Sequence, residues 1–114
     1  MDKRKDKRLH MKLHVKLRSG TTVSWGILTD VSENGLFIKS NRAFAADTEI
    51  DIEIVMQDNS TSLLKGIVKR KIEMPEEHRK YGLGIELTEK DHRFLNLVGS
   101  FLDHSDMRTV KMTG

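Results

Sequence analysis

The sequence predicts an all-β fold: a small six-stranded antiparallel barrel with one C-terminal α-helix. Apolar and polar residues alternate in six short stretches between residues 9 and 87, as in strands with one buried face. After residue 88 the apolar spacing changes to that of a helix, and this happens only once. Short consecutive strands followed by one amphipathic helix are typical of a small barrel with a helix packed on it.

The first two predicted strands show the alternation most clearly. Residues 9–17 are apolar at every odd position, and the polar positions between them include His10 and His14, which we expect to face solvent. After the turn "SGTT", the second strand covers residues 23–31. Its predicted core face consists of Val23, Trp25, Ile27, Thr29 and Val31.

The third and fourth strands are shorter. The turn "SENG" leads into residues 36–40, and Gly35 is expected to supply a positive φ there. A looser connection, "NRAFAADT", separates this strand from the fourth, where isoleucines alternate with acidic residues over 50–56.

The fifth strand follows the turn "QDNST" and is marked by Leu64, Val68 and Ile72, with Gly66 as a bulge or bend. The loop "MPEEHRK", which holds the only proline, precedes a sixth strand at 81–87.

The helix is predicted from Thr88 to about His104. Thr88 is the expected N-cap, and Glu89 and Asp91 lie in the first turn, where carboxylates favour the helix dipole. The helical apolar positions are Phe94, Leu95, Val98, Phe101 and Leu102. Phe101, like Trp25 of the second strand, is interpreted as a core residue.

The chain is long enough for one domain, at 114 residues, and its charge is unevenly distributed. Residues 1–18 hold eight basic and two acidic side chains, a net charge of +6, whereas the other 96 residues carry 12 basic and 15 acidic ones, or −3. We therefore divide the chain into a flexible basic arm (1–8), a barrel domain with its helix (9–104) and a tail (105–114). A basic arm on a mildly acidic body indicates an anionic partner.

Composition excludes several classes of function. The chain has no cysteine, which excludes disulfides, a thiolate nucleophile and a cysteine-based zinc site. No apolar run is long enough to span a membrane, and no apolar segment follows the basic N-terminus as in a secretion signal, so a cytoplasmic location is expected. His10 and His14 are about 13 Å apart on a strand, too far to share a metal ion. No set of nucleophile, base and orienting residue is found, so the protein is not expected to be an enzyme.

Two motifs and one strand carry a family resemblance. "RKDKR" is an R-x-x-x-R motif formed by Arg4 and Arg8, and "DVSENG" is a D-x-S-x-x-G motif formed by Asp30, Ser32 and Gly35. "YGLGIEL" is similar to the glycine-containing strand that follows them in the same family. Because the two motifs and this strand follow one another along the chain, the sequence resembles the PilZ domain, a bacterial receptor module for cyclic di-GMP. The resemblance extends from Arg4 to about Leu102. The resemblance implies a six-stranded barrel with a C-terminal helix, and it implies cyclic di-GMP as the ligand, with no other cofactor.

The chemistry of the motif residues suits this ligand. An arginine fork fits both the O6/N7 edge of guanine and phosphate oxygens, which lysine does not match bidentately. Asp30 is a charged acceptor for the N1 and N2 donors of guanine, Ser32 both donates and accepts, and Gly35 lets a base approach the backbone. The resemblance also implies that Lys3, before the first arginine, bears on whether one ligand or a stacked pair binds.

The sequence thus predicts a stand-alone cyclic di-GMP receptor that closes its arginine arm over the ligand and passes the signal to a protein partner. Two alternatives stay open. One is a nucleic-acid-binding small barrel that uses the basic arm, although the acidic body disfavours it. The other is a PilZ-type protein-interaction module without a ligand. The partner, the pathway and the choice between monomer and homodimer are left open by the sequence.

Overall fold

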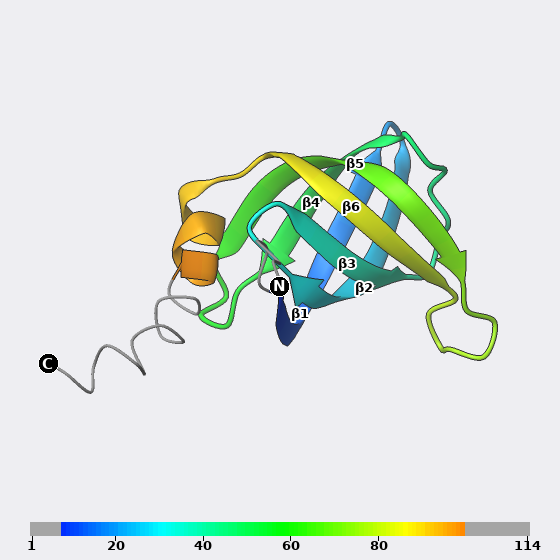
Figure 1. Ribbon diagram of the computed structural model, residues 1–114, viewed down its shortest axis with the longest axis horizontal. Helices are drawn as coiled ribbons and strands as arrows, with labels where there is room; N and C mark the ends of the chain where they lie inside the picture. The colour runs from blue at the N-terminus through cyan, green and yellow to red at the C-terminus, as the bar shows by residue number, and fades with distance from the viewer. Residues whose placement is uncertain (1–7, 100–114) are drawn as a thin grey trace, which may run out of the picture.

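The computed structural model describes residues 8–99, and its six strands close into a single barrel (Figure 1). The strands are β1 (Leu9–Ser19), β2 (Thr22–Val31), β3 (Gly35–Ser40), β4 (Glu49–Val55), β5 (Thr61–Glu73) and β6 (Tyr81–Glu89). Their order around the barrel is β1-β2-β3-β6-β5-β4, and every neighbouring pair is antiparallel. The predicted all-β barrel with one C-terminal helix is confirmed.

The core is filled by the inward-facing residues that the alternation predicted on most strands. Leu13, Val15 and Leu17 of β1 are buried, and β4 contributes Ile50, Ile52 and Ile54. His10 and His14 are exposed on the opposite face of β1, as expected. Burying each large aliphatic side chain contributes roughly 1.5–3 kcal/mol, so these two strands hold much of the stability.

The face of strand β2 that points into the core is not the predicted face but the opposite one. Trp25 is 53% exposed and Val23 is 37% exposed, while the core face is formed by Ser24, Gly26 and Leu28. The small residues let β3 pack closely, because a Cβ on Gly26 would lie 2.5 Å from the carbonyl oxygen of Lys39. The interpretation of Trp25 as a core residue was therefore wrong.

A register shift between β2 and β3 explains why the alternation in the sequence predicted the wrong core face for β2. Leu28 pairs with Ile38 and Asp30 pairs with Phe37, so Thr29 is an extra residue in β2. A β-bulge of this kind reverses which face the following side chains occupy. Val31, beyond the bulge, is fully buried, whereas Asp30 faces outward instead of into the core.

Strand β5 contains two register shifts against β6, at Lys65/Gly66 and at Val68/Arg70. A register shift does lie at Gly66, where a bulge or bend was predicted, but the extra residue is Thr88 of β6. Glycine is needed at position 66 because a Cβ would lie 2.7 Å from the carbonyl oxygen of Glu86. After the second register shift, residues 69–73 of β5 are exposed and no longer contribute to the core. Ile72 is 38% exposed, so it does not share the environment of Leu64 and Val68.

The described part of the helix covers residues 92–99 and lies at the end of the barrel opposite the 74–80 loop (Figure 1). Its N-cap is Asp91, not Thr88, which belongs to β6. Asp91 Oδ1 accepts hydrogen bonds from Phe94 N (2.9 Å) and Ser62 Oγ (2.6 Å), and Oδ2 accepts one from Leu63 N (2.7 Å). One carboxylate therefore caps the helix and ties it to β5.

The helix closes the core with Phe94 and Val98, which are almost completely buried, whereas Leu95 is 43% exposed. Partial burial acts to raise the pKa of Asp91, but the hydrogen bonds from Ser62, Leu63 and Phe94 outweigh it and hold this pKa below its usual value. Phe101 and the predicted helix end at His104 lie outside the described residues.

Candidate ligand-binding cleft

Five residues on five neighbouring strands form a continuous row across the outside of the barrel. His10 of β1 pairs with Asp30 of β2, and Asp30 pairs with Phe37 of β3. Phe37 pairs with Gly84 of β6, and Gly84 pairs with Arg70 of β5. Directly opposed residues share a face of the sheet, so the row is set by strand register alone.

A cleft of about 690 Å³ follows this row. Its lining is mostly polar or glycine, and it consists of Arg8, His10, Asp30, Ser32, Asn34, Gly35, Leu36, Phe37, Lys69, Arg70, Gly84, Ile85 and Glu86. Basic side chains therefore come from β5 and from the residue before β1, while the acidic Asp30 comes from β2 between them. The cleft suits a ligand that has both anionic and hydrogen-bonding groups.

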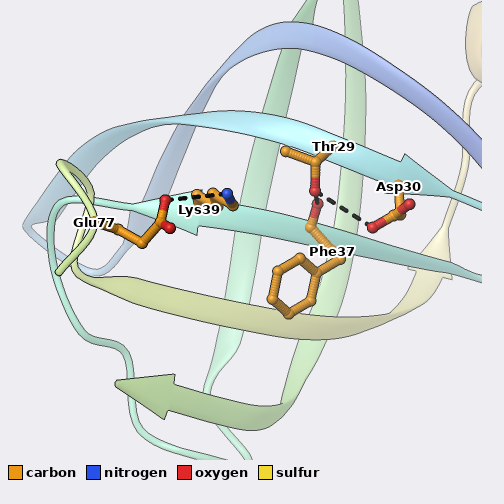
Figure 2. Close-up of polar contacts among 5 residues, drawn as sticks. All are labelled: Thr29, Asp30, Phe37, Lys39 and Glu77. Atoms are coloured by element: carbon orange, nitrogen blue, oxygen red, sulfur yellow. Dashed lines mark hydrogen bonds and ion pairs between the residues drawn. The ribbon is translucent and has the colours of Figure 1, made fainter. Parts of the chain in front are cut away.

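Asp30 is held in place by its neighbours on the barrel surface. Its side chain is 24% exposed, and its Oδ1 lies 2.5 Å from Nδ1 of His10. Figure 2 shows the Thr29 hydroxyl directed at both Asp30 and the carbonyl group of Phe37. It lies 3.4 Å from Asp30 Oδ2 and 3.4 Å from Phe37 O. The hydroxyl of the bulge residue thus lies between the carboxylate and β3 and can donate its proton to either oxygen.

The turn after Asp30 is rigid, and Ser32 is part of its interior. Ser32 is 2% exposed, its N–H donates to the carbonyl oxygen of Gly35 (2.9 Å), and its hydroxyl lies 3.5 Å from the same oxygen. Lys90 Nζ donates to Glu33 O and Asn34 Oδ1, both at 2.9 Å, and Leu87 N donates to Asn34 O at 2.9 Å. The turn is therefore anchored to the end of β6.

Gly35 is needed for close packing and not for an unusual backbone angle. It begins β3, and it is not among the residues with positive φ, so that prediction was wrong. A Cβ at Gly35 would lie 3.2 Å from the carbonyl oxygen of Ile85 on β6. Glycine therefore keeps β3 close to β6 at the edge of the cleft and leaves the backbone there accessible.

The two glycines of β6 give room to side chains of the neighbouring strands. A Cβ on Gly82 would lie 2.5 Å from Cζ of Phe37, so the ring lies over this glycine. Arg70 lies over Gly84 less tightly, because its Nε and Nη2 are 3.5 Å and 4.0 Å from the position of a Cβ, which is ordinary van der Waals contact. Gly84, between Phe37 and Arg70, therefore adds no side chain of its own to the floor of the cleft, and the Arg70 side chain lies over it.

The model of the PilZ domain family matches residues 2–103 of this chain. The chain belongs to the PilZ family.

Solved structures of PilZ proteins share this fold at low sequence identity. The inhibitor of motility MotI/DgrA of Bacillus subtilis superimposes with a TM-score of 0.73 at 12% identity, over 95% of this chain and 53% of that one. MrkH of K. pneumonia, in a complex with c-di-GMP, gives 0.70 at 10% identity, over 98% and 56%. The PilZ domain of YcgR from Escherichia coli, with c-di-GMP, gives 0.67 at 11% identity, over 96% and 98%.

The chain therefore spans about half the length of the MotI and MrkH chains that it matches, and nearly all of the YcgR domain. Comparison with curated proteins gave no match.

The structure brings four of the predicted PilZ motif residues to one cleft: Arg8, Asp30, Ser32 and Gly35. Arg4 and Lys3 lie outside the described residues. Sequence reasoning missed His10, Phe37, Lys69 and Arg70, which line the same cleft. No local motif marks them, because they reach the cleft through strand register. The glycine pair in "YGLGIEL" was the only signal that pointed to this part of β6.

A second cavity, of about 630 Å³, lies beside the helix and is lined by Met11, Leu13, Met56, Arg93 and Leu97 among others. Of the predicted site residues that lie within residues 8–99, none lines this cavity. Residues 8–99 contain neither a helix long and apolar enough to cross a membrane nor a group of three metal-ligating side chains.

Proposed function

We propose that this protein is a receptor for cyclic di-GMP and not an enzyme. One observation carries the proposal: Arg8 of the first motif lines the same cleft as Asp30, Ser32 and Gly35 of the second, although more than 20 residues separate them. The c-di-GMP complexes of MrkH and of the YcgR domain, which share this fold, support the choice of ligand.

The proposed roles follow from the chemistry of each group. Asp30 accepts from N1 and N2 of a guanine, so the ligand competes with His10 for the carboxylate. Arg4 and Arg8 bind phosphate or guanine acceptors with planar forks. Ser32 and Gly35 act mainly by shaping the turn, because Ser32 is buried and Gly35 packs on β6.

Ligand binding is proposed to order the arginine arm across the cleft and so to form a new surface for a protein partner. Lys3 is proposed to influence whether one ligand molecule or a stacked pair is held. The cytoplasmic location and the choice between monomer and homodimer remain predictions.

Calorimetric titration tests the proposal, because it gives affinity and stoichiometry together. We expect micromolar binding of cyclic di-GMP, about −8 kcal/mol, and much weaker binding of GTP, GMP and cyclic AMP, which lack the second guanine and the closed ring with two phosphates. Competition by GTP as strong as by cyclic di-GMP would refute the proposal.

A comparison of arm variants separates this receptor from a general polyanion binder. Arg4→Lys keeps the charge but loses the bidentate geometry, so binding should weaken by about 1–3 kcal/mol. Lys5→Ala and Lys7→Ala remove charge between the motif arginines and should cost less, since they contribute only screened attraction. If the two alanine variants are the more damaging, the arm binds polyanions by charge count, as a nucleic-acid-binding barrel does.

A further inference from the structure

The cleft has two walls, and the PilZ motifs account for only one of them. Asp30 stands on β2, and Arg70 stands on β5, three strands further around the barrel. With about 4.8 Å between neighbouring strands, their Cα atoms are roughly 14 Å apart along the sheet. Between these two residues in the row lie Phe37 of β3 and Gly84 of β6.

Register shifts place both walls. The bulge at Thr29 turns Asp30 outward, and the shift between Val68 and Arg70 makes Lys69 the extra residue, so that Arg70 instead of Lys69 pairs with Gly84. Bulges near sites commonly re-aim one side chain in this way. Without the second shift, Lys69 would face Gly84 and Arg70 would turn toward the inside of the barrel.

The surroundings of the two basic residues of β5 that line the cleft, Lys69 and Arg70, differ. Lys69 Nζ lies 3.6 Å from Glu86 Oε1, so a carboxylate already partners this ammonium group. Across residues 8–99, no ion pair is formed by Arg70, whose guanidinium lies over Gly84 on the floor of the cleft. Its five N–H donors are therefore presented to the cleft with a planar geometry that lysine lacks.

We propose that Arg70 is a specificity-determining residue of the cleft: its guanidinium binds O6 and N7 of the guanine whose N1 and N2 donate to Asp30. This inference rests on the proposed function. A guanine has its donors on one edge and the O6/N7 acceptor pair on another, so a base lying between the two walls meets an acceptor at one wall and a donor fork at the other. Adenine, with an amino group in place of O6, would place a donor against the Arg70 donors.

The test compares cyclic di-GMP with its 7-deazaguanine analogue, which lacks N7, by calorimetry on the unaltered protein and on Arg70→Ala. We expect Arg70→Ala to bind cyclic di-GMP about tenfold more weakly. The analogue should bind the unaltered protein about tenfold more weakly than cyclic di-GMP does, and this penalty should be largely absent in Arg70→Ala. Arg70→Lys, which keeps the charge without the fork, should behave like Arg70→Ala.

Lys71→Ala is the matched control, because Lys71 is an exposed basic residue next to Arg70 on β5 that does not line the cleft. We expect it to change affinity by about twofold or less and to keep the full penalty for the analogue. Thermal unfolding of ligand-free Arg70→Ala should match that of the unaltered protein, since Arg70 is exposed.

Two outcomes overturn the assignment of Arg70 while the proposed function stands: Arg70→Ala binds cyclic di-GMP as well as the unaltered protein does, or it binds weakly but keeps the full penalty for the analogue. Failure of the unaltered protein to bind cyclic di-GMP refutes the proposed function, and this inference with it.

Discussion

Replacing Asp91 with alanine should lower the free energy of unfolding by about 2–4 kcal/mol. The carboxylate accepts three hydrogen bonds, from Ser62 Oγ at 2.6 Å, Leu63 N at 2.7 Å and Phe94 N at 2.9 Å. Loss of the helix cap costs about 0.5–2 kcal/mol. Ser62 has no exposed surface, so leaving its hydroxyl without this partner adds roughly 1–3 kcal/mol.

Urea unfolding measures this difference, and a second variant identifies its source. Asp91→Asn keeps a good cap and one acceptor oxygen, so it should cost less than Asp91→Ala. In the double variant with Ser62→Ala, part of the alanine cost should disappear, because the buried hydroxyl has gone as well. A loss of less than about 0.5 kcal/mol in Asp91→Ala, with the slope against urea unchanged, would refute this account of how the helix is held.

The pH dependence of the same variants has a defined sign. The pKa of Asp91 lies below its usual value of 3.8 in the folded protein, so the unfolded chain binds the proton more readily. The stabilising contribution of this carboxylate is therefore complete above the unfolded pKa and is lost as the pH falls through the folded pKa. The advantage of the unaltered protein over Asp91→Asn should be constant near neutral pH and should shrink below about pH 4.

Three further predictions concern the cleft and the barrel. Asp30→Ala should weaken binding of cyclic di-GMP about tenfold or more, through loss of a charge-assisted hydrogen bond, and calorimetry together with the melting temperature of the free protein checks that the fold is spared. Gly26→Ala should destabilise by about 1–3 kcal/mol in urea unfolding, because its Cβ would lie 2.5 Å from the carbonyl oxygen of Lys39, and an unchanged midpoint would contradict the packing described. Gly20→Ala should cost about 1 kcal/mol for another reason, its φ of +62°, and the same assay should show no further loss from sterics, since nothing lies within 4 Å of the added atom.

The number of strands and their approximate positions along the chain were predictable because alternation records which segments have one buried face, and turn residues separate them. Which side chains of β2 point into the core could not be predicted in the same way. Val23, Trp25 and Ile27 alternate as a core face would, and only the extra residue at Thr29 brings Val31 inward while Trp25 stays outside. Bulges depend on pairing with distant strands, so a single strand's pattern does not locate them.

The residues of the candidate site also fall into two groups, those that local sequence identifies and those that only strand pairing brings together. Arg8, Asp30, Ser32 and Gly35 belong to short motifs and could be identified from local sequence. His10 and Arg70 become neighbours of that site only through the register of β1 with β2 and of β5 with β6. The role of Gly35 was misjudged because its constraint is the closeness of Ile85 O, on a strand 50 residues away.

The seam that closes the barrel has a mechanical consequence. Strand β1 pairs with β4 only from Val15 to Arg18, whereas its pairing with β2 extends back to Leu9. The ring is therefore complete only from Val15 onward, and residues 9–14 form a lip joined to the barrel along one side. A force on the N-terminal end of β1 would peel this lip, and with it the contact between His10 and Asp30, before it reached the closed ring. The closed ring therefore begins at Val15, and peeling the lip as far as this residue would also uncover Leu13 of the core.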